Sequence, residues 1–567
     1  MSRSNADGIT RRGFVGQVGL LLAGVRAGGE WVLAAETSTV ASSPEFVTAT
    51  TSAGRVRGKV DQGIRIFKGI PYGGTTEGKN RFMPPTPPTP WTDTRDALDW
   101  GSSAPQTIPP TTSRQGTESE DCLVLNVFTP GLDRAKRPVM VWLHGGGWAN
   151  GSGSTPITDG TNLARTGDVV LVSINHRLNV FGYTALGHSA GSDFTASGAV
   201  GLLDIVAALQ WVRDNIDRFG GDPNLVTIFG QSGGGRKVAA LMAMPAAKGL
   251  FQRAIVESGA ILRLMDPVDA ERQTSLLLTV LGLKPGQMRE LQNVPMGQLL
   301  LANDKANDLL VDKWPIREHG WAANTPTIVE KYLPHHPWDP NGPALSTDIP
   351  LMIGWAHTEE TNWVRPTPEN LALDEAGLQQ RVEARLRAGT ILYKDRQVQM
   401  FGKRAGHVDV QRVIDAFRWD NPGATPFDLY VLIASDDPRG AHAREIGKRK
   451  AAQHGAPAYV YRFDWQTPEG GGMRSPHALD IQFAVNNIAL GGKLISKRQD
   501  AYDLANKVSA SWVAFARTGN PGTPQLPDWP AYSAARRDTM LFNIESRVAQ
   551  DPNHRARAAM EHVLGIA

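Results

Sequence analysis

Short, almost unbroken apolar runs alternate with helical segments along most of this chain, and this alternation limits the possible folds. The runs read PVMVWLHG, VVLVSINH, LVTIFG, RAIVESG, PLMIGWA and PAYVYRF. Strands that are covered on both faces are expected to be apolar at nearly every position. Residues 201–221 place Leu202, Ile205, Leu209 and Val212 at helical spacing. The pattern predicts an α/β fold with a large, mostly parallel sheet flanked by helices.

Two longer segments, roughly 264–346 and 365–450, interrupt the alternation with mainly helical, amphipathic sequence. We interpret them as insertions into a single catalytic domain, residues 36–567, and we expect them to cover the active site.

The composition excludes several classes of function. The 567 residues include 59 basic and 56 acidic side chains without a basic stripe, so nucleic-acid binding is not expected. No apolar run reaches the ~18 residues that a membrane anchor needs. H-E-x-x-H and C-x-x-C patterns are missing from the sequence, and we expect neither a metal nor a cofactor.

The first 35 residues have the pattern of a targeting segment. Arg11 and Arg12 precede a short apolar stretch, and small residues follow in VLAAETS. This resembles a bacterial twin-arginine export signal and predicts cleavage near Ala34 or Ala35. The protein is then exported, to the periplasm or the medium. The alternative is a plain basic tail.

A glycine-rich turn follows the run LVTIF. It reads Gly230-Gln231-Ser232-Gly233-Gly234 and fits G-x-S-x-G, the turn that presents a nucleophilic serine above a sheet. The phosphate-binding patterns G-x-x-x-x-G-K-[ST] and G-x-G-x-x-G do not fit. The turn predicts Ser232 as a nucleophile, and a glycine turn without chemistry is the alternative.

A second glycine run, HGGGW, follows the strand predicted at PVMVWL. Glycines leave backbone N–H groups free to stabilise the oxyanion that forms when a serine attacks a carbonyl. We expect Gly146, Gly147 and Gly233 to supply these donors. His144 stands inside the motif, and we assign it a structural role rather than that of the base.

From about residue 44 onward the chain resembles the type-B carboxylesterases, a family that includes the cholinesterases. The matching segments are RIFKGIPYG, RFMPP, SEDCLVLNVFTP, VWLHGGGW, NHRLNVFGY, FGGDPNLVTIFGQSGGG and AIVESG. The resemblance implies an α/β-hydrolase fold and a serine hydrolase that cleaves small-molecule carboxylic esters through an acyl-enzyme.

The resemblance also implies the other two members of a catalytic triad, in the order Ser, acid, His. His477 in MRSPHALDI matches the base. Glu359, five residues after Gly354, matches the acid, and Glu360 is the alternative. The acid would hold the imidazole in its productive tautomer.

Further residues have structural roles in the family. The resemblance implies buried ion pairs of Glu120 with Arg177 and of Asp121 with Arg81. Cys122 is the only cysteine, and Ala104 stands where the family has its usual disulfide partner, so the resemblance implies a buried free thiol.

The sequence thus predicts an exported carboxylic-ester hydrolase. The same mechanism acting on amides or carbamates is one alternative, and a catalytically silent binding protein is another. The chain has a candidate for every triad member, which argues against a silent protein. Gln231 stands where cholinesterases carry Glu, so cationic substrates are not favoured.

Overall fold

The apolar runs form strands in the computed structural model of this protein. The structure describes residues 45–107, 115–313, 324–388, 390–393, 396–399, 408–495 and 497–566. All of them belong to one structural unit, Glu45–Ala567. The twin-arginine segment and the expected cleavage site lie outside the described residues.

Parallel strands form the centre of the sheet. They are β6 (Arg137–Leu143), β7 (Val170–Ile174), β8 (Gly221–Gln231), β9 (Arg253–Glu257), β10 (Leu351–Ala356), β13 (Ala458–Phe463) and β14 (Asp538–Phe542). Their spatial order is β7-β6-β8-β9-β10-β13-β14, with parallel pairing throughout. Nearly all of their residues are buried, as expected for strands that are covered on both faces.

Antiparallel strands extend the sheet at both edges. At one edge these are β1 (Phe46–Thr50), β2 (Arg55–Asp61), β3 (Ile64–Pro71) and β5 (Val124–Thr129), with the short β4 (Arg95–Asp96) beside β2, and at the other edge β15 (Arg547–Gln550). In the described chain the sheet has 13 strands and is mixed but mostly parallel through its centre, as predicted.

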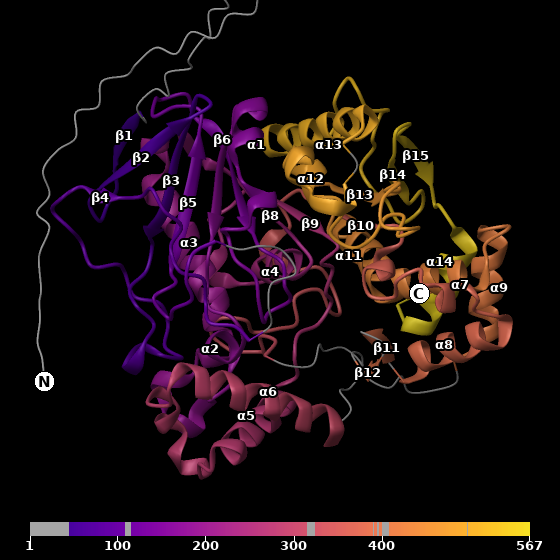
Figure 1. Cartoon of the computed structure of the whole chain (residues 1–567), viewed down its shortest axis with the longest axis horizontal. Coiled ribbons are helices and arrows are strands. Elements are labelled where there is room, and N and C mark those ends of the chain that lie inside the picture. Colours follow the sequence, from indigo (N-terminus) through magenta and orange to yellow (C-terminus); the bar gives the residue numbers. More distant parts are fainter. Residues whose placement is uncertain are drawn as a thin grey trace, which may run out of the picture. The chain divides into compact units, whose positions relative to one another are not determined.

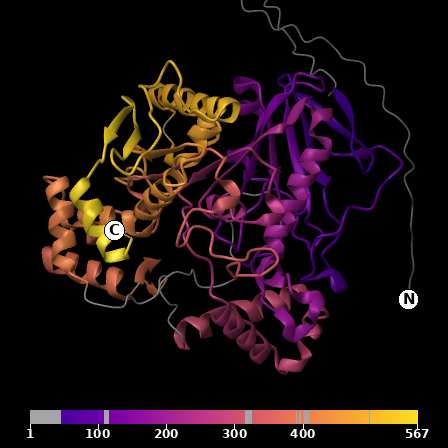
Figure 2. The ribbon, with the colours of Figure 1, turned by 180° about the vertical axis from the view of Figure 1, so that it is seen from behind.

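Helices lie along both faces of the central strands (Figures 1 and 2), and alternate side chains of these strands belong to two separate cores. Val139 and Val141 pack in one core with α3 (Val200–Asn215), α4 (Gly233–Leu241) and α11 (Ala441–Ala451). Met140 and Trp142 pack in a second core, whose helices are α1 (Thr161–Gly167), α12 (Ile481–Ala484) and α13 (Gln499–Thr518). The period of two residues along each strand produces this division.

The helix predicted over residues 201–221 is α3, which continues in a 3₁₀ turn and ends at Gly220 with φ +77°. Among the described residues, the stretch Ser192–Phe219 is long and apolar enough to cross a membrane by length and composition, and 83% of its most apolar window is buried. Since its side chains pack in the core beneath the sheet, this stretch is a core helix.

The two interrupting segments contain most of the remaining helices. The first holds α5 (Pro267–Leu281) and α6 (Met296–Lys313), which share a core with α2 (Asn179–Tyr183). The second holds α7 (Pro368–Leu371), α8 (Glu375–Ala388), α9 (Val410–Asp420), α10 (Pro426–Ser435) and all but the last residue of α11. It also holds a hairpin, β11 (Thr390–Tyr393) and β12 (Arg396–Gln399), which the helical pattern did not indicate.

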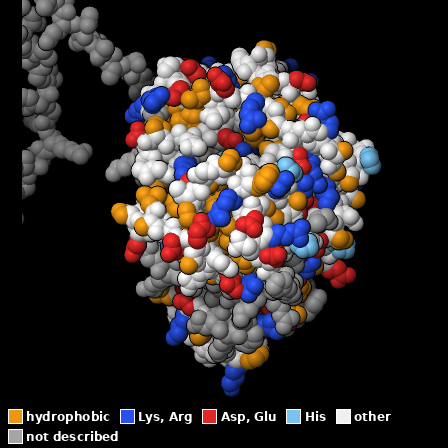
Figure 3. All heavy atoms as spheres, turned by 90° about the vertical axis from the view of Figure 1, so that its right-hand side faces the viewer, with side chains coloured by type: hydrophobic (Ala, Val, Ile, Leu, Met, Phe, Trp, Pro, Cys, Tyr) orange, Lys and Arg blue, Asp and Glu red, His pale blue; other side chains and the backbone are white. Residues whose placement is uncertain are grey.

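The C-terminal helix α14 (His554–Leu564) shares a core with α8, α9 and α10. Acidic and basic side chains are interspersed on this side of the molecule, and neither sign covers the face shown in Figure 3.

The predicted partners in the buried ion pairs are wrong. Arg81 pairs with Glu120 at 2.5 Å, and Arg177 pairs with Asp204 of α3 at 2.6 Å, all four side chains being buried. Asp121 is exposed. Water solvates its charge, so it needs no buried partner, whereas a buried arginine does. Cys122 is a buried free thiol, as predicted.

Candidate active site

Ser232 occupies the sharp turn between β8 and α4. Its φ of +57° and ψ of −120° lie in a region that residues other than glycine rarely adopt. The Ser232 N–H donates to the Glu257 carbonyl of β9 at 2.8 Å, and the Arg236 N–H donates to the Ser232 carbonyl at 3.0 Å. Neighbouring elements thus hold the strained turn predicted from G-x-S-x-G.

The glycines around Ser232 are required by close backbone contacts. A Cβ atom added at Gly230 would lie 2.5 Å from the Leu143 carbonyl oxygen, and one added at Gly234 would lie 1.9 Å from the same atom. Both distances are far shorter than any real contact. Only glycine therefore allows the β8–α4 turn to approach the end of β6 this closely.

The second glycine run follows β6 and lies against the serine turn. Gly146 and Gly147 have φ values of +88° and +65°. A Cβ atom on Gly233 would lie 2.1 Å from the carbonyl oxygen of Gly147 and 2.4 Å from its nitrogen. Within the described chain, the N–H groups of Gly146, Gly147 and Gly233 have no hydrogen-bond acceptor. The structure thus brings together the three expected oxyanion donors.

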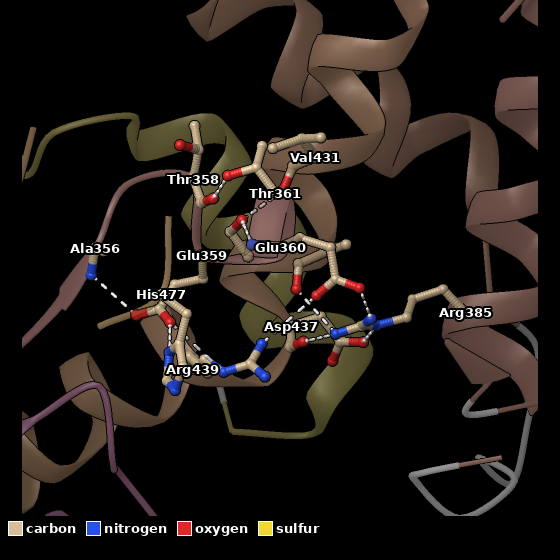
Figure 4. Close-up of polar contacts among 12 residues, drawn as sticks. Ala356, Thr358, Glu359, Glu360, Thr361, Arg385, Val431, Asp437, Arg439 and His477 are labelled. Carbon is tan, nitrogen blue, oxygen red and sulfur yellow. Dashed lines mark hydrogen bonds and ion pairs between the residues drawn. The ribbon is translucent and has the colours of Figure 1, made fainter. Parts of the chain in front are cut away.

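Glu359 and His477 meet although they are far apart in sequence (Figure 4). Glu359 opens the 3₁₀ turn Glu359–Asn362 after β10, and His477 lies in the loop after β13. The Glu359 carboxylate accepts from the Ala356 N–H at 2.9 Å through Oε1 and contacts His477 Nδ1 through Oε2. The Glu359 side chain is fully buried. The expected acid and base therefore form a direct contact.

Glu360 points away from His477. Its carboxylate lies 3.1 Å from Arg385 Nη1 and 3.6 Å from Arg439 Nη1, and its N–H donates to Ser435 Oγ. Arg385 also contacts Asp437, so the second interrupting segment surrounds this carboxylate. Of the two adjacent glutamates, only Glu359 contacts the imidazole (Figure 4).

Gln231 links the serine turn to the imidazole. Its Nε2 lies 3.4 Å from His477 Nδ1 and 3.3 Å from His477 Nε2. The Trp363 ring packs against the imidazole, with ring centroids 4.9 Å apart. Ser232 and His477 are both described, and no hydrogen bond joins the serine hydroxyl to the imidazole in this state. Catalytic hydrogen bonds are often long without a substrate.

The electrostatic environment favours a neutral imidazole beside an ionised carboxylate. Burial lowers the pKa of His477, Glu359 opposes this shift, and the charges of Arg439 and Arg236 add to it. Burial alone would raise the pKa of Glu359, but His477 and Arg439 outweigh it and the pKa is lowered. For Glu360, burial outweighs Arg385 and Arg439 and raises the pKa. A neutral imidazole held by an anion is suited to general-base chemistry.

Sequence reasoning assigned no role to several buried ionisable groups next to the site, although Asp480 stands three residues after His477 where the family usually has Glu. Arg439 lies in the π-helical turn Asp436–Gly440, and its Nε is 3.7 Å from Glu359 Oε2. Glu257, in AIVESG, accepts from Trp512 Nε1 at 2.7 Å, and Asp480 accepts from the Tyr461 hydroxyl at 3.3 Å. Burial raises the pKa of both carboxyls. Glu257 had one sequence signal of its burial, because it stands at the end of a predicted buried strand.

Known proteins with the same fold and motifs settle the family. The sequence profile described as "Carboxylesterase family" matches residues 44–560. This chain belongs to the carboxylesterase family. It therefore has the α/β-hydrolase fold and hydrolyses carboxylic esters. In the described part of the chain, no group of three or more His, Cys, Asp or Glu side chains could hold a metal ion.

The alignments with individual relatives extend over almost the whole of this carboxylesterase. It is 35% identical to a para-nitrobenzyl esterase of Bacillus subtilis over 514 residues, which span 90% of this chain and 97% of that protein. It is 31% identical to a phenmedipham hydrolase of Pseudarthrobacter oxydans, over 89% and 98% of the two chains. A crystal structure of a Geobacillus stearothermophilus carboxylesterase aligns with a TM-score of 0.75 at 34% identity, over 90% and 99% of the two chains.

Proposed function

We propose that this carboxylesterase cleaves esters with a triad of Ser232, His477 and Glu359. The contact of Glu359 with His477 Nδ1 carries the proposal, because it fixes the imidazole with its other nitrogen available to a serine. The strained turn at Ser232 supports it further, since such a turn presents the hydroxyl above the sheet.

The reaction has two halves. His477 Nε2 removes the proton from Ser232 Oγ as the oxygen attacks the ester carbonyl, and the N–H groups of Gly146, Gly147 and Gly233 stabilise the oxyanion. His477 then gives its proton to the leaving alcohol, which leaves an acyl-serine. A water molecule, deprotonated by the same imidazole, releases the acid. Glu359 stays ionised and stabilises the imidazolium.

Covalent labelling combined with substitution tests the nucleophile. A fluorophosphonate should modify Ser232 in the intact protein, as located by peptide mass spectrometry. Ser232→Ala should abolish labelling and lower kcat by up to ~10⁶ while the melting temperature stays close to that of the wild type. A label on another residue, or near-normal turnover by the variant, would overturn the assignment.

The choice of substrate is a separate question. Gln231 adds no negative charge beside His477, so an attraction for cationic alcohols is not part of the proposal. We propose ester rather than amide hydrolysis as the main activity. Comparing kcat/KM for para-nitrobenzyl esters, phenmedipham and matched anilides distinguishes the two. If kcat/KM for the anilides equals or exceeds that for the esters, the proposal that esters are the main substrates is wrong. No turnover of any of these substrates would favour a binding protein.

We also propose that the chain is an exported bacterial protein with a twin-arginine signal. Arg11 and Arg12, the short apolar stretch and the small residues in VLAAETS support this. N-terminal sequencing of the exported protein should place its start close to Glu36. Changing both arginines to lysine should retain active enzyme in the cytoplasm. Export that is unaffected by the double substitution would mean that residues 1–35 are a plain basic tail.

A further inference from the structure

A lysine is buried directly beneath the oxyanion loop, which we define as residues 144–147. Lys237 follows Ser232 by five residues on α4, and its side chain is completely buried. Its Nζ donates to the carbonyl oxygen of His144 at 2.9 Å. His144 immediately precedes the glycines that supply the proposed oxyanion donors. This hydrogen bond joins α4, the helix that follows Ser232, to the loop that follows β6.

The surroundings of the Lys237 amine disfavour its charged form. No Asp or Glu among the described residues forms an ion pair with Lys237, and its neighbours are the His144 and His176 rings, Arg236 and the Trp148 ring at 5.9 Å. Burial, followed by the charge of Arg236, lowers the pKa of Lys237 to about 7. A buried amine without a counter-charge costs stability, and an apolar side chain would fit this core with a lower cost.

The oxyanion loop has few other supports. Gly146 and Gly147 have positive φ values, and no glycine of the loop contributes side-chain packing. The His144 ring stacks on the His176 ring, with centroids 4.8 Å apart, and its Nδ1 contacts the Gly145 carbonyl. The Lys237 side chain adds a directed hydrogen bond to the close backbone packing of Gly147 against Gly233 at the start of α4. It therefore helps to set the position of the Gly146 and Gly147 N–H groups relative to Gly233.

We propose that Lys237 is a positioning residue for ester hydrolysis, which holds the oxyanion loop at the distance from Ser232 that the developing oxyanion requires. This inference rests on the proposed catalytic roles of Ser232 and the glycine N–H groups. Donors that are placed before the reaction stabilise charge that exists only in the transition state. Loosening the loop should therefore lower kcat and leave KM nearly unchanged.

Lys237→Met tests this proposal, because it keeps the length of the side chain and removes the donor. We expect kcat to fall by about 10- to 100-fold, which is less than the 10²–10³ lost when an oxyanion donor is deleted. Affinity for a trifluoromethyl ketone, which forms an oxyanion on the serine, should fall by a similar factor. Lys237→Gln retains a donor and should recover part of both losses.

Lys450 offers a matched control. It is also completely buried, its Nζ donates to the carbonyls of Ser346 and Thr347 at 3.0 and 2.6 Å, and burial lowers its pKa to about 8. Lys450→Met should lower the melting temperature and leave kcat and inhibitor affinity unchanged. Equal effects of the two Met variants on kcat would overturn the positioning role, as would an unchanged kcat in Lys237→Met.

Fluorophosphonate labelling separates this test from a failure of the proposed function. If Ser232 is not the nucleophile, the wild-type protein is not labelled there. If only the Lys237 inference is wrong, wild type and Lys237→Met label Ser232 at equal rates. Should Lys237→Met fail to fold, Lys237→Gln carries the test, and a wild-type kcat and inhibitor affinity together with a lowered melting temperature would reduce Lys237 to a structural residue.

Discussion

Glu359 and Glu360 are neighbours in sequence, but the turn after β10 sends their carboxylates into different environments. Glu359 contacts the imidazole of His477, whereas Glu360 lies between the guanidinium groups of Arg385 and Arg439. Both side chains are buried. The same substitution at the two positions should therefore have different consequences, one for catalysis and one for stability.

Glu359→Gln should lower kcat by up to ~10⁴, the loss seen when the triad acid of chymotrypsin-like proteases becomes an amide, because the imidazole loses its productive tautomer. Glu360→Gln should retain most of kcat and destabilise the fold by up to about 3–5 kcal/mol, because it removes one of the buried carboxylates that face Arg385 and Arg439 and leaves them with Asp437 and Glu359. Turnover and urea unfolding of both variants check the pair. The opposite ranking in kcat would assign the acid role to Glu360.

The pH dependence of activity should report the environment of His477. The neutral imidazole is the active form, and burial together with Arg439 and Arg236 disfavours the protonated form. Activity should therefore rise with pH to a plateau, and its midpoint should lie below the ~6.5 of free histidine. Measuring kcat/KM for an activated ester over a range of pH gives this midpoint. Arg439→Met should move the midpoint upward, and a wild-type midpoint above 7 would contradict this account.

At the scale of elements, the site depends on how closely α4 approaches the end of β6. Gly234 in α4 and Gly297 in α6 are both helical glycines, but they differ in surroundings. A Cβ atom at Gly234 would lie 1.9 Å from the Leu143 carbonyl oxygen, whereas one at Gly297 would meet nothing within 4 Å. The contact at Gly234 is with backbone, which cannot rotate away as a side chain can.

Gly234→Ala should therefore push α4 away from β6, lower the melting temperature and abolish fluorophosphonate labelling of Ser232. Gly297→Ala should leave activity unchanged and stabilise the fold by up to about 1 kcal/mol, because alanine favours helix over glycine. Thermal unfolding and the labelling rate of the two variants check this contrast. A Gly234→Ala protein with wild-type labelling would show that the turn tolerates a side chain.

Elements and motifs could be predicted because their signals are local. The central strands are marked by unbroken apolar runs, and the turn at Ser232 is marked by glycines that its geometry demands. The pairing of charges could not be predicted, because it depends on which buried surfaces meet. Asp204 is one of several polar residues on α3 and nothing local marks it as the partner of Arg177. Arg439 approaches Glu359 from the segment 365–450, whose sequence indicated helices but not their packing.

At the scale of the whole molecule, the sheet brings distant strand ends to one place. The oxyanion loop follows β6, Ser232 follows β8, Glu359 follows β10 and His477 follows β13. These strands are near neighbours in the order β6-β8-β9-β10-β13. Strand ends that meet at a common edge are the usual place for a site in parallel α/β sheets.

Cys122 provides a probe of this whole assembly. The thiol is completely buried, and burial raises its pKa far above that of a free cysteine. A disulfide reagent such as DTNB should therefore react with it only when the protein unfolds, and the titration should give one thiol per chain in urea. Labelling in urea should follow the loss of activity. Rapid reaction of the native protein would contradict the buried position.

The order of the strands along the chain has a consequence for biosynthesis. A ribosome releases the oxyanion loop first, then Ser232, then Glu359, and the proposed base His477 only when the segment after β13 has emerged. A growing chain that ends between Glu359 and His477 holds Ser232 and Glu359 but lacks the imidazole of His477. With the proposed triad, the chain therefore gains the ability to attack esters only after residue 477 of its 567 residues has been added.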